Sequence, residues 1–187
     1  VDGALEGQTS RIKKDGRTWS YVLHEADSPE TSDVVITQND VRQIQLAKAA
    51  LYAGIKLLMD EMGVTTVDRI RLAGAFGSHI SVSHAMVLGL IPDCDLAQVT
   101  SAGNAAGAGA RMALLDRNAR LEIANTIAKA ERIETALADD FQAHFVGAMG
   151  LPHQSDSFPN LFTHIAPPAE KAAVQTDRGR RRRRRTT

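Results

Sequence analysis

The stretch Arg69-Ile70-Arg71-Leu72-Ala73-Gly74-Ala75-Phe76-Gly77-Ser78 gives the clearest indication of the fold. Residues 68–73 have the composition of a short strand, which runs directly into Gly74. Glycine permits positive φ and lets a ligand approach the backbone without meeting a Cβ atom. A turn of this kind can offer backbone N–H groups to a phosphate or lie flat against a base. On these residues alone, an ordinary strand-to-helix turn is the alternative interpretation.

Strand and helix signals alternate on both sides of this turn. Strands are predicted at residues 17–25, 34–37, 68–73 and 96–101. Helices are predicted at residues 40–62 with Asn39 or Asp40 as N-cap and Gly63 as the stop, from Ser81 or Ser83 to Gly89, and at 104–116, 118–130 and 140–149. Residues 132–137 fit either a strand or continued helix. The alternation predicts a layered α/β domain, whose ligands bind at the carboxyl ends of the strands.

The helix at residues 40–62 has an apolar face and a polar face. The apolar residues recur at spacings of three, four and seven, which predicts the face that packs on the core. They are Val41, Ile44, Leu51, Ile55, Leu58 and Met62. The opposite face carries Gln38, Arg42, Gln45, Lys48 and Tyr52. The simplest interpretation of this polar face is that it is solvated.

A second glycine cluster occupies residues 101–110, after the last predicted strand. Gly103 and Asn104 begin a helix, where free N–H groups and the helix dipole favour anions. Inside that helix, Gly107 and Gly109 each cost about 1 kcal/mol relative to alanine, and close packing on a neighbour is the favoured explanation. Neither cluster is a P-loop or a G-x-G-x-x-G fingerprint.

Composition narrows the class of protein. A 43% hydrophobic content suffices for a core, and 4% aromatic residues suit an α/β domain better than a β-sandwich. The single cysteine, Cys94, cannot form an internal disulfide or hold a cysteine-ligated cluster, which points to a cytoplasmic protein. No run reaches the ~18 apolar residues of a membrane span.

The charge is unevenly distributed. Residues 1–177 carry 15 basic and 22 acidic side chains, and the other seven basic residues are Arg178 and Arg180 to Arg185. An acidic body disfavours nucleic-acid binding. The arginine run could bind nucleic acid through counterion release, but no aromatic residue interrupts it to stack on bases. Two other roles of the arginine run remain open: it could fold back onto the acidic body, or it could do no more than aid solubility. A role without a specific partner is favoured.

Four stretches together resemble one family, the reductive activators of corrinoid proteins. They are residues 36–50, residues 72–77, residues 89–94 and residues 103–109, which occur in the family's order. The resemblance implies an actin/Hsp70/sugar-kinase-like (ribonuclease H-like) lobe, with a mixed sheet flanked by helices. It also implies ATP with Mg²⁺ in the full-length protein and a [2Fe-2S] cluster in an upstream domain. The implied activity returns Co(II) corrinoid proteins to Co(I) for methyl transfer.

The same resemblance assigns a nucleotide-binding role to particular residues. Gly74, Ala75, Phe76, Gly77 and Ser78 would contact adenosine, and Gly103 and Asn104 would close the lobe. Gln45 and Lys48 could then reach the base or ribose. The phosphate-binding hairpins and the cluster cysteines would lie upstream, so this chain alone should neither hydrolyse ATP efficiently nor carry electrons. A corrinoid protein is the implied partner, and a homodimer is left open.

These observations divide the chain into a lobe at residues 1–152, an irregular surface segment at 153–166 and a disordered Arg-rich tail at 167–187. No metal site is predicted, because His79 and His84 are poorly spaced for one helical face. Cys94 is expected to be a buried, inert thiol. Two other functions remain: an activator of a radical dehydratase or a hydantoinase-like actin-fold ATPase, and a non-enzymatic module that binds nucleic acid through the arginine tail.

Overall fold

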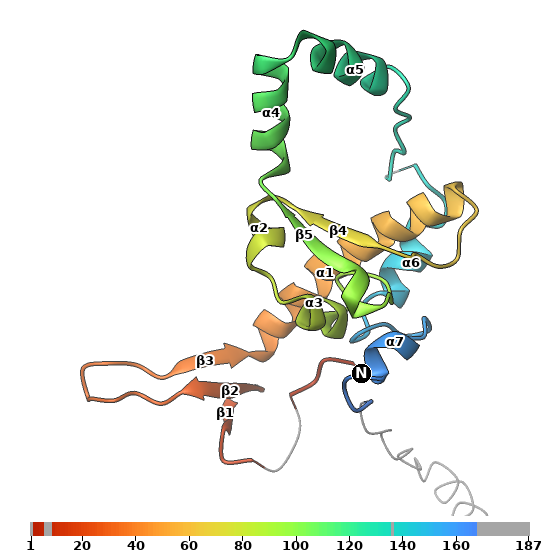
Figure 1. Ribbon diagram of the computed structural model, residues 1–187. Coiled ribbons are helices and arrows are strands. Elements are labelled where there is room, and N and C mark those ends of the chain that lie inside the picture. The colour runs from red at the N-terminus through yellow and green to blue at the C-terminus, as the bar shows by residue number, and fades with distance from the viewer. Residues whose placement is uncertain (1, 6–8, 136, 168–187) are drawn as a thin grey trace, which may run out of the picture.

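The computed structural model describes residues 2–5, 9–135 and 137–167, so the arginine run lies outside the described residues (Figure 1). The elements follow one another along the chain as β1 (Ile12–Asp15), β2 (Thr18–His24), β3 (Val34–Thr37), α1 (Gln38–Glu61), β4 (Ile70–Ala73), α2 (Gly74–His79), α3 (Val82–Leu88), the 3₁₀ turn η1 (Leu96–Gln98), β5 (Val99–Gly103), α4 (Ala105–Leu115), α5 (Arg117–Ile127), α6 (Phe141–Gly147) and α7 (Pro159–Phe162).

The strands form two sheets, one antiparallel and one parallel. The first has the order β1-β2-β3, and its neighbouring strands are antiparallel. In the second, β4 pairs with β5 in parallel, as a strand–helix–strand crossover requires. The predicted α/β class, with a mixed arrangement of strands and flanking helices, is confirmed.

Helix α1 begins earlier than predicted. Its N-cap is Thr37, not Asn39 or Asp40. The Thr37 hydroxyl accepts a bond from the Asp40 backbone N–H, and the Asp40 carboxylate accepts one in return from the Thr37 backbone N–H at 2.8 Å. This reciprocal capping box satisfies two donors at the helix start. The predicted stop is confirmed, since Gly63 follows the C-cap with a φ of +64°.

The buried face of α1 differs from the predicted one. Ile44, Leu51, Leu58 and Met62 are all exposed, whereas Gln45, Lys48, Ala49, Tyr52, Ala53, Leu57 and Met59 are buried. The predicted polar face is therefore largely an internal one. The periodicity argument failed because it assumed that apolar residues alone mark the buried side. Here the polar side chains of α1 hydrogen-bond to other segments, which makes their burial tolerable.

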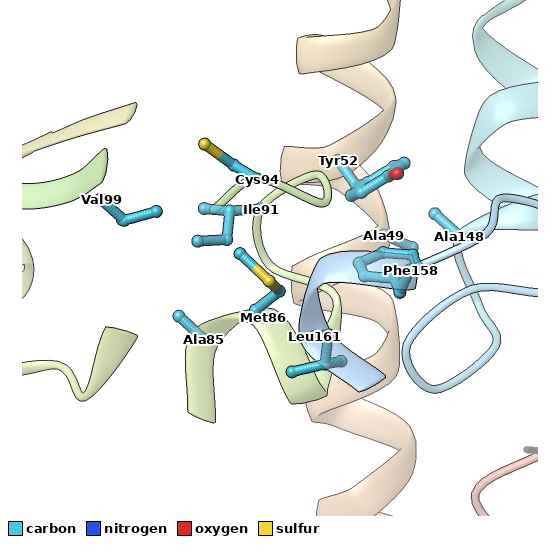
Figure 2. Packing of buried hydrophobic residues seen from close by; sticks show 10 residues of the cluster. All are labelled: Ala49, Tyr52, Ala85, Met86, Ile91, Cys94, Val99, Ala148, Phe158 and Leu161. Carbon is cyan, nitrogen blue, oxygen red and sulfur yellow. The ribbon is translucent and has the colours of Figure 1, made fainter. Parts of the chain in front are cut away.

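The core lies between α1, α3 and the C-terminal segment (Figure 2). Ala49 and Tyr52 of α1 face Phe158 and Leu161, which come from more than 100 residues further along the chain. Met86 of α3 and Ile91 and Cys94 of the following loop pack beside them. The predicted irregular surface segment at 153–166 is thus wrong at these positions, since Phe158 and Leu161 are 1% exposed and α7 lies within it.

The remaining elements follow the predicted order with several exceptions. Strand β1 and the short helix α2 were not predicted. Residues 132–135 form neither strand nor helix, and β5 begins at Val99 because η1 takes up the preceding residues. Helices α4 and α5 project from the rest of the molecule (Figure 1), and neither contains a buried residue. A Cβ atom added at Gly109 would meet nothing within 4 Å, so close packing does not explain this glycine within the described residues. None of the described helices is long and apolar enough to cross a membrane.

Candidate nucleotide site

The parallel pairing of β4 and β5 brings the two glycine clusters to one edge of the sheet. Ala73, the last residue of β4, lies opposite Gly103, the last residue of β5. Gly74 follows Ala73 directly and opens α2, while Asn104 follows Gly103 and caps α4. Residues 30 positions apart therefore form a single surface at the carboxyl ends of the strands, which is where α/β sheets bind ligands.

Both turns need glycine for its backbone conformation rather than for space. Gly74 has a φ of +89° and Gly103 a φ of +61°, in the left-handed region that side chains disfavour. A Cβ atom at either position would meet nothing within 4 Å. Each turn is consequently both left-handed and open around the position where a Cβ atom would stand.

Gly77 is required for a different reason. It is buried in α2, and an added Cβ atom would lie 2.7 Å from the backbone carbonyl carbon of Leu72. Glycine here lets the short helix pack directly onto β4. The Ser78 hydroxyl donates a 2.9 Å hydrogen bond to the carbonyl oxygen of Gly74, which closes the turn. The tetrad predicted as a turn is thus part of a six-residue helix held against its own strand.

Asn104 is committed to helix capping. Its side-chain oxygen accepts a 2.8 Å bond from the Gly107 backbone N–H. An added Cβ atom at Gly107 would lie 2.6 Å from the Asn104 side-chain amide, so Gly107 makes room for the cap. The other N–H groups of the first turn of α4 have no partner within the helix, and they lie at the helix end that favours anions.

Gln45 and Lys48 do not belong to this surface. Gln45 is 1% exposed and donates to the carbonyl oxygens of Asp2, at 3.1 Å, and of Met149, at 2.7 Å. Lys48 is fully buried and donates to the carbonyl oxygens of Gly150 and Pro152. The structure therefore contradicts the exposed polar face on which their predicted contact with base or ribose depended.

These two residues begin a polar ladder on α1 that also includes Tyr52 and Lys56. The Tyr52 hydroxyl donates a 2.9 Å bond to the Asp156 carboxylate, which Lys56 also contacts at 3.3 Å. Spacings of three, four and four place the four side chains on one helical face. Each holds the C-terminal segment of residues 149–156 against α1. That spacing was visible in the sequence, but the partners, about 100 residues away, were not.

Burial of the polar ladder shifts the pKa values of its side chains and of their partner Asp156. Desolvation lowers the pKa of Lys48 to about 8, and burial together with the bond to Asp156 raises the pKa of Tyr52. Burial alone would raise the pKa of Asp156, but the Tyr52 hydroxyl, His153 and Lys56 together outweigh it and lower that pKa. Burial therefore sets the pKa of Lys48, whereas hydrogen-bond and charge partners also contribute for Tyr52 and Asp156.

A large cavity also lies away from the glycine turns. It has a volume of about 660 Å³ and is lined by Asp68, which precedes β4, by Asp95, which precedes β5, and by the ladder residues Tyr52 and Lys56. It is therefore at the amino ends of the parallel strands. Its walls hold four carboxylates against the ammonium of Lys56, and this excess of negative charge disfavours a nucleotide phosphate. We assign the candidate nucleotide site to the opposite edge for that reason.

Cys94 behaves as predicted. It is 1% exposed, and burial raises its pKa, so the thiol is not activated. Across the described part of the chain, no group of three or more His, Cys, Asp or Glu side chains is arranged to hold a metal ion.

Comparison with known proteins identifies relatives. The sequence model of a family described as the C-terminal domain of RACo, the ASKHA domain, matches residues 2–162. The chain is 39% identical over 108 residues to the corrinoid activation enzyme RamQ of Eubacterium limosum, which covers 57% of this chain and 18% of that protein. It is also similar to the solved structure of a reductive activator for corrinoid, iron–sulfur protein, with a TM-score of 0.69 and 30% identity over 81% of this chain and 25% of the other. The chain thus spans about a quarter or less of these relatives.

Proposed function

Because this chain belongs to the family of C-terminal ASKHA domains of RACo, we propose that it is the nucleotide-contacting lobe of an ATP-dependent reductive activator of corrinoid proteins. Both matched relatives are described as corrinoid activators, which favours this function over a radical dehydratase activator or a hydantoinase-like ATPase. The full-length protein would use ATP to return a Co(II) corrinoid protein to Co(I).

The observation that carries the proposal is the pairing of Ala73 with Gly103. It places the turn at Gly74 and the N-terminus of α4 side by side, although nothing in the sequence spacing required this. We propose that Gly74, Ala75, Phe76, Gly77 and Ser78 lie against the adenosine. The first-turn N–H groups of α4, together with Gly103 and Asn104, would face the phosphates, since helix N-termini attract anions.

In this proposal the lobe supplies binding energy and leaves redox chemistry to other parts. A nucleotide that binds one arrangement of the two lobes more tightly than the other would shift the population toward that arrangement. This shift would drive the partner corrinoid protein toward reduction. Cys94 is the single cysteine and is buried with a raised pKa, so the chain's residues do not fit a [2Fe-2S] cluster. Any cluster and any Mg²⁺ would be held by residues outside this chain.

The experiment compares the full-length protein with two matched glycine variants. Reductant, ATP and a Co(II) corrinoid protein are mixed, and the visible spectrum reports formation of Co(I). We expect ATP to be required. We also expect Gly74→Ala to weaken ATP binding ~10-fold, equivalent to about 1.4 kcal/mol.

The control is Gly16→Ala, in the turn between β1 and β2. Gly16 also has positive φ, +56°, and open space around it, so the backbone strain is similar while the site is distant. Equal ATP affinity in both variants would show that Gly74 is not part of the nucleotide site. ATP-independent reduction of cobalt would reject the function itself.

A further inference from the structure

The arginine run takes no part in the proposed nucleotide site. It consists of Arg178 and Arg180 to Arg185, outside residues 2–162, which the family model matches. The family therefore supplies no function for the run. Residues 1–177 carry 15 basic and 22 acidic side chains, so the rest of the chain is a partner of opposite charge. Which part of that acidic body can hold the run depends on where unpaired carboxylates gather.

Unpaired carboxylates gather in the cavity at the amino ends of β4 and β5. This cavity, of about 660 Å³, is lined by four carboxylates and by the ammonium of Lys56. Lys56 contacts Asp156 at 3.3 Å, so these two charges compensate each other. The other three carboxylates, of Asp68, Asp93 and Asp95, form no ion pair with any residue that the structure describes. The cavity therefore carries an excess of negative charge.

The three unpaired carboxylates lie close enough to act on the same neighbour. Burial raises the pKa of the Cys94 thiol, and the charges of all three carboxylates raise it further. Asp93 accepts hydrogen bonds of 3.0 Å from two backbone N–H groups of α7, and Asp95 accepts one of 2.9 Å from the backbone N–H of Ala97. These neutral donors hold two of the carboxylates in place and leave their charge uncompensated.

The walls of the cavity suit an arginine side chain in particular. A guanidinium group donates two parallel hydrogen bonds to a carboxylate, while its methylene stem packs on apolar surface. Met59, Val67 and Pro92 supply apolar surface in the same cavity. A hydrated inorganic cation would make no use of that surface. The combination of carboxylates and apolar side chains therefore favours arginine.

The run is within reach of the cavity. Pro159 and Asn160, at the start of α7, line the cavity. Pro167 is the last residue that the structure describes, and Arg178 is the eleventh residue after it. A chain of that length spans up to ~40 Å. Because the run and the cavity belong to one polypeptide, the run also has a high effective concentration at the cavity.

We propose that the arginine run docks in this cavity and pairs with Asp68, Asp93 and Asp95. Docking lays the chain that follows α7 across the amino ends of β4 and β5, and it withholds the arginines from polyanions such as nucleic acid. It selects one of the roles that the sequence leaves open for the run. Since the cavity lies away from the glycine turns, the inference does not depend on the proposed function.

Trypsin tests the proposal, because it cleaves after arginine and acts on the run only while the run is undocked. Full-length protein freed of nucleic acid is digested briefly at low salt, and mass spectrometry measures the rate at which the run is released. The cavity variant combines Asp68→Asn with Asp95→Asn, and asparagine keeps the cap at residue 95. The control variant, Glu122→Gln with Glu131→Gln, removes the same charge from two exposed positions that do not line the cavity.

We expect the cavity variant to release the run ~10-fold faster than the wild type, and the control variant to match the wild type within ~2-fold. High salt should accelerate release from the wild type but not from the cavity variant, because salt screens the ion pairs that the variant already lacks. Asp68→Asn alone should give a smaller acceleration, which keeps the test valid if the double variant misfolds. Equal rates in all three proteins, or equal acceleration in both variants, would overturn the proposal. Protection that appears only when nucleic acid is added would overturn it as well.

Discussion

The ammonium of Lys48 donates a 2.6 Å hydrogen bond to the backbone carbonyl oxygen of Pro152, 104 residues further along the chain. The same ammonium also donates to the carbonyl oxygen of Gly150. An added Cβ atom at Gly89, after α3, would lie 2.0 Å from that Pro152 oxygen and 3.0 Å from the Lys48 nitrogen. Lys48 therefore joins α1, the end of α3 and the C-terminal segment at one buried point.

Replacing Lys48 should destabilise the fold. Lys48→Met fills the same space but leaves two buried carbonyl oxygens without donors, which we expect to lower the free energy of unfolding by about 2–4 kcal/mol. Arg42→Met, on the exposed surface of the same helix, is the control and should change it by less than ~0.5 kcal/mol. Urea unfolding of both variants measures the difference, and equal stability would show that Lys48 does not hold the segment.

Stability should also depend on pH through Lys48. Its pKa is lowered from 10.5 to about 8 in the folded state, so between pH 8 and 10 the unfolded chain binds more protons. The free energy of unfolding is therefore lower below pH 8, where the buried amine is protonated, and it increases as the pH rises toward 10. The neutral amine still has two N–H donors for its two carbonyl partners, so these hydrogen bonds are kept.

The measurement is the difference in unfolding free energy between the wild type and Lys48→Met across this pH range. The difference should grow by ~1–3 kcal/mol from pH 8 to 10. Taking the difference cancels the contributions of Tyr52 and Cys94, whose raised pKa values act in the opposite direction. If this difference in unfolding free energy did not change with pH, burial would not lower the pKa of Lys48.

Two glycines with open surroundings should respond to alanine in opposite ways. Gly74→Ala forces a side chain into a φ of +89° and should cost about 1–2 kcal/mol. Gly109→Ala lies inside α4 with nothing within 4 Å of the new Cβ atom and should stabilise by about 0.5–1 kcal/mol. Thermal unfolding of both variants tests the pair. A destabilised Gly109→Ala would mean that α4 packs closely against something at this position.

Asn104→Asp separates helix capping from ligand binding. Aspartate caps a helix as well as asparagine does, so the stability of α4 should be unchanged or slightly raised. A carboxylate at this position would repel a phosphate at the proposed site and weaken ATP binding ~10-fold at low salt, with a smaller effect at high salt. Calorimetric titration at two salt concentrations checks this. Unchanged ATP affinity would place the phosphates elsewhere.

Several features of the fold followed from local sequence. Gly63 and Gly89 end helices in the left-handed conformation, and Ser81 and Asn104 cap the helices predicted to begin there. Such signals act over one turn of chain, so they can be recognised without knowing the tertiary structure. Most of the order of strands and helices, and hence the α/β class, was predictable for the same reason, although β1, α2 and α7 were missed.

The buried side of α1 was not predictable in this way. Its apolar stripe at Leu51 and Leu58 looked like the core face, yet the side that is covered carries Gln45, Lys48 and Tyr52. Burial of those side chains depends on backbone carbonyl oxygens and a carboxylate supplied about 100 residues later. No local pattern encodes that dependence.

The glycine turn at residues 74–78 shows the same division. The sequence alone determined that a strand ends at Gly74 in a conformation that favours glycine, because φ preferences are a property of the residue and its immediate neighbours. Only the tertiary structure decided that Gly74 lies beside Gly103 and away from Lys48. The pairing of β4 with β5 and the hydrogen bonds to residues 149–152 fix those positions, and both arise between segments distant in the chain.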